Sequence, residues 1–266
     1  MELFYRDFGT GFPVVILHGL YGSSDNWTGI ARELSENFRV IIPDQRNHGR
    51  SPHDPVHTYS ALAEDLLELI IKLELDKFIL AGHSMGGKAA SWFSRLWPEK
   101  LSGLVIVDMT PFRSNPGENP IYYFHRKILT AMNVTDLDKF KSRDEANVIF
   151  DSVTSSVRIR QFLLKNITRT KEGRFKWKLN PAYLEKNLMN ILDGFERIEK
   201  VLEPLSGFPV RFLRAGNSEY ITEEDIPYIL RLYPGAEIVT VNGASHWLHA
   251  EYPEVFIRTI REILDY

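Results

Sequence analysis

The stretch AGHSMGG, residues 81–87, places three glycines around one serine, between two unlike segments. The preceding DKFIL (76–80) is short and apolar, which indicates a strand, and the following KAASWFSRLW (88–97) indicates a helix. The five residues GHSMG (82–86) match the pattern G-x-S-x-G, which forms a nucleophile elbow when a strand precedes it and a helix follows it. The sequence therefore predicts that Ser84 lies at the tip of a tight turn with its hydroxyl exposed.

The geometry of a nucleophile elbow explains why glycines flank this serine. Side chains two residues before and after such a serine would collide, and the serine itself must adopt a strained backbone conformation. The N-terminus of the following helix also directs free N–H groups toward the place where an oxyanion would develop. The alternative is a simple Gly-rich turn of a nucleotide-binding fold, but neither the dinucleotide fingerprint G-x-G-x-x-G nor the P-loop pattern is present here.

Short apolar runs that end at turn residues recur along the chain. Because these runs are continuous rather than alternating, they indicate strands buried on both faces of a sheet. Helical patterns lie between them, and this alternation predicts an α/β fold with a mostly parallel sheet flanked by helices. Residues 2–9 would add an antiparallel hairpin at the sheet edge. The predicted strands are 12–19, 38–44, 76–82, 101–108, 208–216 and 236–243, and the predicted helices are 25–38, 59–73, 225–234 and 253–264.

Residues 112–205 interrupt the alternation of predicted strands and helices. Their patterns are mostly helical, with a possible short strand pair around GRFKWKL (173–179), and no strand of a parallel sheet is evident. We therefore expect a helical insertion between two strands of the sheet. The chain then divides into a first part of the core (1–111), the insertion (112–205) and a second part of the core (206–266).

Composition excludes several classes of protein. The 266 residues include 32 Lys and Arg against 35 Asp and Glu, so no basic excess points to nucleic acid. The absence of cysteine excludes disulfides, thiolate catalysis and Cys-ligated zinc. No apolar run approaches the ~18 residues of a membrane span, and the opening MELFYRDFGTG does not look like a signal peptide. We expect a cytoplasmic protein without a cofactor, a metal or a membrane span; its oligomeric state is not indicated.

A serine nucleophile needs a base to take its proton and an acid to orient that base. Among the eight histidines, His246 is the best placed, because it follows the predicted strand 236–243 and precedes the final helix. His83 lies inside the turn and is expected to point away from its tip. His18 ends an early strand, where it would shape the loop, and His249 is expected to be structural.

Two carboxylates are candidates for the acid. Asp108 ends the strand that follows the serine helix, and Glu219 follows the next strand along the chain. Either gives the order Ser…acid…His that this architecture requires. We favour Asp108 because its side chain is shorter and stiffer and because it ends a strong strand, and we keep Glu219 as the alternative.

The oxyanion formed during acyl transfer needs backbone N–H donors. One donor should be the N–H of Met85, directly after the nucleophile. The other should come from the loop after the early strand, where the sequence LHGLYGSSDNW (17–27) places Leu20 behind a His-Gly turn. Leu20 and Met85 are therefore the predicted oxyanion-hole residues.

Together these segments resemble the α/β-hydrolase superfamily. The combination of DQRNHGRSP with VDMTP is more particular, and it is similar to YbfF-type esterases and abhydrolase-domain, thioesterase-like serine hydrolases. The resemblance implies that the acid lies at Asp108, although the wider superfamily usually carries it after the next strand, near Glu219. The segments that carry the resemblance are LHGLYGSSDNW (17–27), PDQRNHGRSP (43–52), AGHSMGG (81–87), VDMTP (107–111) and NGASHWLHAEYPE (242–254).

The same resemblance implies roles outside the three catalytic positions. The insertion 112–205 corresponds to a helical cap that roofs the site. Within the segment 43–52, Asp44 and Arg46 are expected to pair with each other. Two sets of cap residues are candidates for substrate contacts: Tyr122, Tyr123, Phe124 and Met132 for an acyl pocket, and Arg113, Arg126, Lys127, Arg158 and Arg160 for a basic patch that an acyl-CoA would favour.

The function expected from these residues is hydrolysis of a small-molecule carboxylic ester or acyl thioester. Ser84 would attack the acyl carbon, and His246 would carry the proton to the leaving group. A second possibility is cleavage of a C–C bond, or a lyase reaction, on a diketone-like substrate, because related triads perform such chemistry. A third, from another class, is a ligand-binding sensor with little turnover.

Overall fold

The computed structural model describes residues 1–113, 120–143, 145–197 and 203–264. At its centre is a seven-stranded sheet with the strand order β1-β3-β2-β4-β5-β8-β9. Every neighbouring pair is parallel except β1 and β3, which pair antiparallel at one edge. The strands are β1 (Tyr5–Phe8), β2 (Phe12–Leu17), β3 (Phe38–Pro43), β4 (Phe78–His83), β5 (Leu101–Val107), β8 (Val210–Ala215) and β9 (Glu237–Val241).

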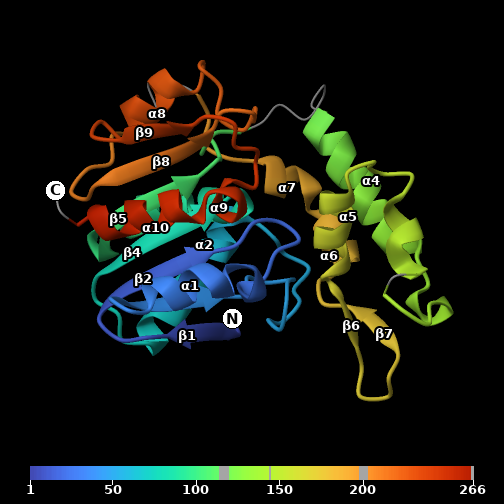
Figure 1. The fold of residues 1–266 in the computed structure, drawn as a ribbon. Helices are drawn as coiled ribbons and strands as arrows, with labels where there is room; N and C mark the ends of the chain where they lie inside the picture. The colour runs from blue at the N-terminus through green and yellow to red at the C-terminus, as the bar shows by residue number, and fades with distance from the viewer. Residues whose placement is uncertain (114–119, 144, 198–202, 265–266) are drawn as a thin grey trace.

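Helices cover both faces of this sheet, which explains the continuous apolar character of its strands (Figure 1). In β2, Val14 and Ile16 pack in one core with α1 and α10, whereas Val15 and Leu17 pack in the other core with α2, α3 and α8. The alternation of side chains along a strand therefore supplies two separate apolar layers. The covering helices are α1 (Thr28–Leu34), α2 (Tyr59–Lys72), α3 (Met85–Leu96), α8 (Ile226–Leu232) and α10 (Pro253–Glu262).

The long helix α2 shows how local sequence sets an element. The side chain of Thr58 accepts a hydrogen bond from the N–H of Ala61, which caps the first turn. Leu62, Leu66 and Leu69 follow at spacings of three and four residues, and all three are buried against the sheet. None of the helices in the described ranges is long and apolar enough to cross a membrane.

The described residues from 120 to 192, which we call the cap, lie beside the sheet as a separate group of helices with a protruding hairpin (Figure 1). The hairpin pairs β6 with β7 antiparallel, close to the strand pair expected around 173–179. Residues 114–119, 144 and 198–202 of the predicted insertion lie outside the described residues. The cap elements are α4 (Pro120–Val134), α5 (Val157–Leu164), β6 (Ile167–Arg169), β7 (Phe175–Trp177), α6 (Pro181–Lys186) and α7 (Leu188–Leu192).

The predicted hairpin at the sheet edge is wrong in its partner. β1 is an antiparallel edge strand, as expected, but it pairs with β3 and not with the adjacent β2. The turn between β1 and β2 passes through Gly9 and Gly11, which have φ angles of 70° and 108°. A Cβ on Gly11 would lie 2.9 Å from the carbonyl oxygen of Asn37, so this turn is held tightly against the chain that enters β3.

Candidate active site

Ser84 occupies the turn between β4 and α3 with φ 54° and ψ −123°, a strained conformation for a residue with a side chain. The flanking glycines make this turn possible. A Cβ on Gly82 would collide with the carbonyl oxygen of Gly86, and a Cβ on Gly86 would collide with the carbonyl oxygen of Leu17. The motif therefore folds as an elbow because only glycine fits at these two positions.

His246 and Asp108 meet beyond the carboxyl ends of two parallel strands, β9 and β5, which are separated in the sheet by β8. His246 lies between β9 and the short helix α9 (Leu248–Glu251), and Asp108 follows β5 directly. The imidazole Nδ1 lies 2.8 Å from Oδ2 of Asp108. Because an ionised carboxylate can only accept, Nδ1 carries the proton, and Nε2 is the nitrogen left to act as a base.

The carboxylate of Asp108 is fully buried and held by further donors. Its Oδ1 accepts a hydrogen bond from the N–H of Ala215 at 3.0 Å, and its Oδ2 accepts a second one from the hydroxyl of Ser218 at 2.5 Å. Asp108 itself has a φ of 45°, so its backbone is also unusual. These contacts leave the carboxylate little freedom except to face His246.

Glu219, the alternative acid, lies elsewhere. It is exposed, and within the described ranges no hydrogen bond or ion pair joins its carboxylate to His246. It lines two cavities that Tyr220 also lines. The structure thus brings Asp108, and not Glu219, to the imidazole.

Ser84 and His246 both line an apolar pocket of about 220 Å³ between the sheet and the cap. The ring of Tyr220 stacks on the imidazole of His246, with a distance of 3.8 Å between the ring centroids. The apolar wall opposite comes from helices α4 and α5, and it includes Phe124 and Phe162. A pocket of this kind can hold an acyl chain with its carbonyl carbon next to Ser84.

A second cavity of about 530 Å³ also reaches Ser84, and its lining is more polar. Leu20 and Met85, the two predicted oxyanion-hole residues, both line it. Among the described residues, neither of these N–H groups donates a hydrogen bond. Gly19 lies tightly against the elbow, since a Cβ there would be 3.1 Å from Cβ of Ser84.

The remaining histidines near the elbow form a buried support. His83 lines the apolar pocket beside Ser84, and its Nε2 donates to the carbonyl oxygen of His246 at 2.8 Å. His249 stacks on Trp27, and burial lowers the pKa of His249 to about 3. His18 shapes the loop before Leu20 through its Nδ1, which lies 2.9 Å from the carbonyl oxygen of Gly19.

Other expectations from the sequence are only partly met. Phe124 lines the apolar pocket, whereas Met132 is buried in the core and Tyr123 is half exposed. The expected pairing of Asp44 with Arg46 is wrong. Arg46 forms a buried ion pair with Asp65, with Nε 2.6 Å from Oδ2, and Asp44 instead accepts from backbone N–H groups.

The proposed basic patch is largely neutralised where it approaches the site. Arg113 pairs with Asp193 at 2.7 Å, and Arg158 pairs with Glu251. Arg160 pairs with Asp151 at 3.1 Å. Within the described residues, no group of three or more acidic or histidine side chains could hold a metal ion.

Three residues of the site carried no signal in the sequence. Lys88 is buried one helical turn after Ser84, and its Nζ donates to three backbone carbonyl oxygens, those of Phe112, Leu192 and Asp193. Tyr21 and His125 contact each other between the oxyanion loop and the cap. Each of these roles depends on a partner far away in the chain, so no local motif could reveal it.

The chain is similar to known proteins over most of its length. The family model described as the alpha/beta hydrolase fold matches residues 13–253. An sn-1-specific diacylglycerol lipase, ABHD11 of Xenopus laevis, is 37% identical over 94% of this chain and 78% of the relative. Esterase YbfF of Escherichia coli is 34% identical over 95% of this chain and 93% of the relative.

Among solved structures, a marine microorganism esterase is 43% identical to this chain with a TM-score of 0.92, and the match covers 99% of both chains. The family model spans most of the sequence, and two curated relatives exceed 30% identity over nearly all of it. The chain therefore belongs to the α/β-hydrolase family.

Proposed function

We propose that this protein hydrolyses carboxylic esters through an acyl-enzyme formed on Ser84, with His246 as the base and Asp108 as the acid. The observation that carries the proposal is the hydrogen bond between Asp108 and His246, because His246 and Ser84 line the same pocket. Relatives over nearly the whole chain are named as esterases and a lipase, which supports ester hydrolysis.

In the proposed first step, His246 takes the proton of the Ser84 hydroxyl as its oxygen attacks the acyl carbon. Asp108 keeps Nδ1 protonated and stabilises the imidazolium that forms. The N–H groups of Leu20 and Met85 stabilise the tetrahedral oxyanion. In other enzymes, removal of one such donor raises the free energy of the transition state by about 3–4 kcal/mol. The imidazolium then protonates the leaving alcohol.

In the second step, a water molecule attacks the acyl-enzyme with His246 again as the base, which releases the carboxylic acid and restores Ser84. The two cavities at Ser84 can hold the two parts of an ester, the acyl chain and the leaving group. The apolar pocket of about 220 Å³ suits the acyl chain, and the larger, more polar cavity of about 530 Å³ suits the leaving group. A thioester would pass through the same steps, with a thiol as the leaving group.

The test is labelling with a fluorophosphonate probe followed by stopped-flow kinetics with p-nitrophenyl esters. The probe should label Ser84 in the natural protein and not in Ser84→Ala, and the esters should give a burst of p-nitrophenol. Failure of both would refute the proposal. Turnover of a vinylogous diketone without any reaction of esters would favour C–C hydrolysis, and ligand-induced thermal stabilisation without labelling would favour a sensor.

A further inference from the structure

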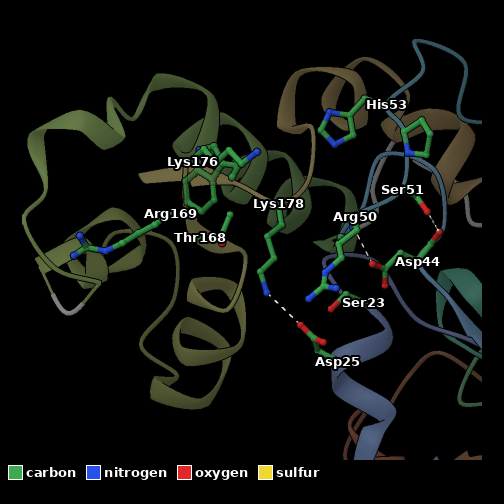
Figure 2. Close-up of a pocket in the computed structure, with 13 residues that line it drawn as sticks. Ser23, Asp25, Asp44, Arg50, Ser51, His53, Thr168, Arg169, Lys176 and Lys178 are labelled. Carbon is green, nitrogen blue, oxygen red and sulfur yellow. Dashed lines mark hydrogen bonds and ion pairs between the residues drawn. The ribbon is translucent and has the colours of Figure 1, made fainter. Parts of the chain in front are cut away.

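A cavity that does not include Ser84 lies between the β6–β7 hairpin of the cap and loops of the core (Figure 2). Its volume is about 680 Å³. The core wall is formed by Ser23, Asp25 and Asp44 together with residues 49–53, most of which belong to the segment PDQRNHGRSP (43–52). The proposed ester hydrolysis gives residues 49–53 no chemical role.

Most of the polar side chains in this segment are used within the core. Asp44 is 2% exposed, and its two oxygens accept from the N–H groups of Ser24 at 2.6 Å and Arg50 at 2.8 Å. Arg46 is paired with Asp65. The side chains of Arg50 and His53 are different, because both are exposed and both line the cavity.

The hairpin supplies further positive charge on the opposite side. Lys176 lies opposite Thr168 in the register of β6 and β7, and Lys178 follows two residues later, so the three residues share one face of the hairpin. All three line the cavity. Figure 2 shows Lys178 and Arg50 extending into the gap from opposite walls.

The charges around this gap do not cancel. Asp25 is the other carboxylate that lines it, and Asp25 is shared by two cations, Arg6 and Lys178. Among the ion pairs of the described residues, none includes Arg50 or Lys176; the guanidinium of Arg50 lies over the ring of Phe4, 4.8 Å from its centroid. A concave site with two unpaired cations on facing walls attracts an anion.

We propose that this cleft binds a phosphate-bearing ligand, with Arg50 on the core wall and Lys176 and Lys178 on the hairpin as its cationic contacts. An arginine offers a planar set of donors that matches two phosphate oxygens, and a lysine adds a mobile point charge. The phosphate belongs either to a soluble phosphate ester or to the headgroup of an anionic phospholipid. The ligand bridges the cap hairpin and the core.

The binding test uses the full chain and inorganic pyrophosphate, followed by isothermal titration calorimetry at low ionic strength. The double variant Arg50→Gln/Lys176→Gln removes two charge-assisted contacts and should bind at least about a hundredfold more weakly, since each such contact contributes about 1.5 kcal/mol or more and about 1.4 kcal/mol is a factor of ten. A matched double variant, Arg174→Gln/Lys171→Gln, removes the same two residue types from the same hairpin region outside the cleft and should bind nearly as the natural protein does. Added salt should weaken binding.

Two vesicle types separate the sources of phosphate. Co-sedimentation with phosphatidylglycerol vesicles but not with phosphatidylcholine vesicles, lost in the cleft variant alone, supports a lipid headgroup. Pyrophosphate binding without vesicle binding supports a soluble ester. The proposal is overturned if the natural protein binds neither probe, or if both double variants lose binding equally, since net charge alone would then explain it.

Two controls keep the result independent of folding and of the proposed hydrolysis. Thermal unfolding should show that each variant folds. If the double variant is unstable, the single variant Lys178→Gln replaces it and should also weaken pyrophosphate binding. In Lys178→Gln the carboxylate of Asp25 keeps its ion pair with Arg6. Hydrolysis of an uncharged short ester should be unchanged in all variants, because the cleft does not include Ser84.

Discussion

The hydroxyl oxygen of Tyr21 lies 3.2 Å from Nδ1 of His125, so the residue next to Leu20 is joined directly to helix α4 of the cap. Tyr21 has a φ of 63°, and its backbone is held on both sides. Its N–H donates to Nε2 of His48 at 3.3 Å, and its carbonyl oxygen accepts from Nδ2 of Asn166 in the cap at 2.9 Å. The cap therefore fixes the loop that presents the proposed oxyanion donor.

We predict that Tyr21→Phe lowers kcat about fivefold with little change in KM, because a hydrogen bond of about 1 kcal/mol that positions Leu20 would be lost. Affinity for a trifluoromethyl ketone, which imitates the oxyanion, should fall by a similar factor. Tyr123→Phe is the control. Tyr123 lies on α4, the cap helix that carries His125, but its side chain is half exposed, so this substitution should change neither kcat nor inhibitor affinity. An unchanged inhibitor affinity in Tyr21→Phe would show that the loop does not depend on this contact.

A second prediction concerns the acid. Asp108→Asn should lower kcat by about 10⁴, the loss seen when the acid of a serine triad is replaced by its amide. The N–H of Ala215 still needs an acceptor, so the amide nitrogen would face His246 and favour the wrong tautomer. Glu219→Gln is the matched substitution, and its kcat should stay within about twofold. If Glu219→Gln, and not Asp108→Asn, lowered kcat by orders of magnitude, the assignment of Asp108 would be wrong.

A third prediction follows from Lys88. Burial lowers the pKa of Lys88 from 10.5 to about 7. Between pH 7 and pH 10.5 the unfolded chain therefore binds more protons at this position than the folded chain does, so the free energy of unfolding rises with pH across that window. Lys88→Met removes this contribution. The difference in the free energy of unfolding between the natural protein and Lys88→Met should therefore change by up to about 1.4 kcal/mol per pH unit.

Urea unfolding of the natural protein and Lys88→Met at several pH values between neutral and mildly alkaline would measure this slope. Lys127→Met, an exposed lysine of α4, is the control and should follow the pH dependence of the natural protein. Parallel curves for Lys88→Met and the natural protein would mean that the three carbonyl oxygens around Nζ keep the ammonium charged in the fold.

The sequence was sufficient for features that local patterns determine. The elbow at Ser84 follows from the glycines at two positions, and the sheet follows from continuous apolar runs that both layers of helices bury. The pairing of β1 with β3 could not be predicted, because the adjacent strand β2 offers an equally plausible hairpin partner. Tyr21 and His125 are 104 residues apart, and only the folded cap brings them together.

The last prediction concerns the acyl chain. Phe162 of α5 closes one side of the apolar pocket and packs edge-on against Trp247, with 4.3 Å between the ring centroids. Phe162→Ala should enlarge the pocket, so kcat/KM should rise for longer p-nitrophenyl esters relative to the acetate. Val157→Ala is the control, because Val157 lies on the same helix and is 61% exposed.

The ratio of kcat/KM values is the informative quantity, since a loss of packing that merely loosens the cap would lower the rates with all esters together. A changed ratio in Phe162→Ala alone would place the acyl chain against α5, because only a chain that reaches this wall can gain apolar contact area from the added space. An unchanged ratio would instead put the acyl chain in the larger, more polar cavity beside Lys88, and would exchange the two ends of the substrate.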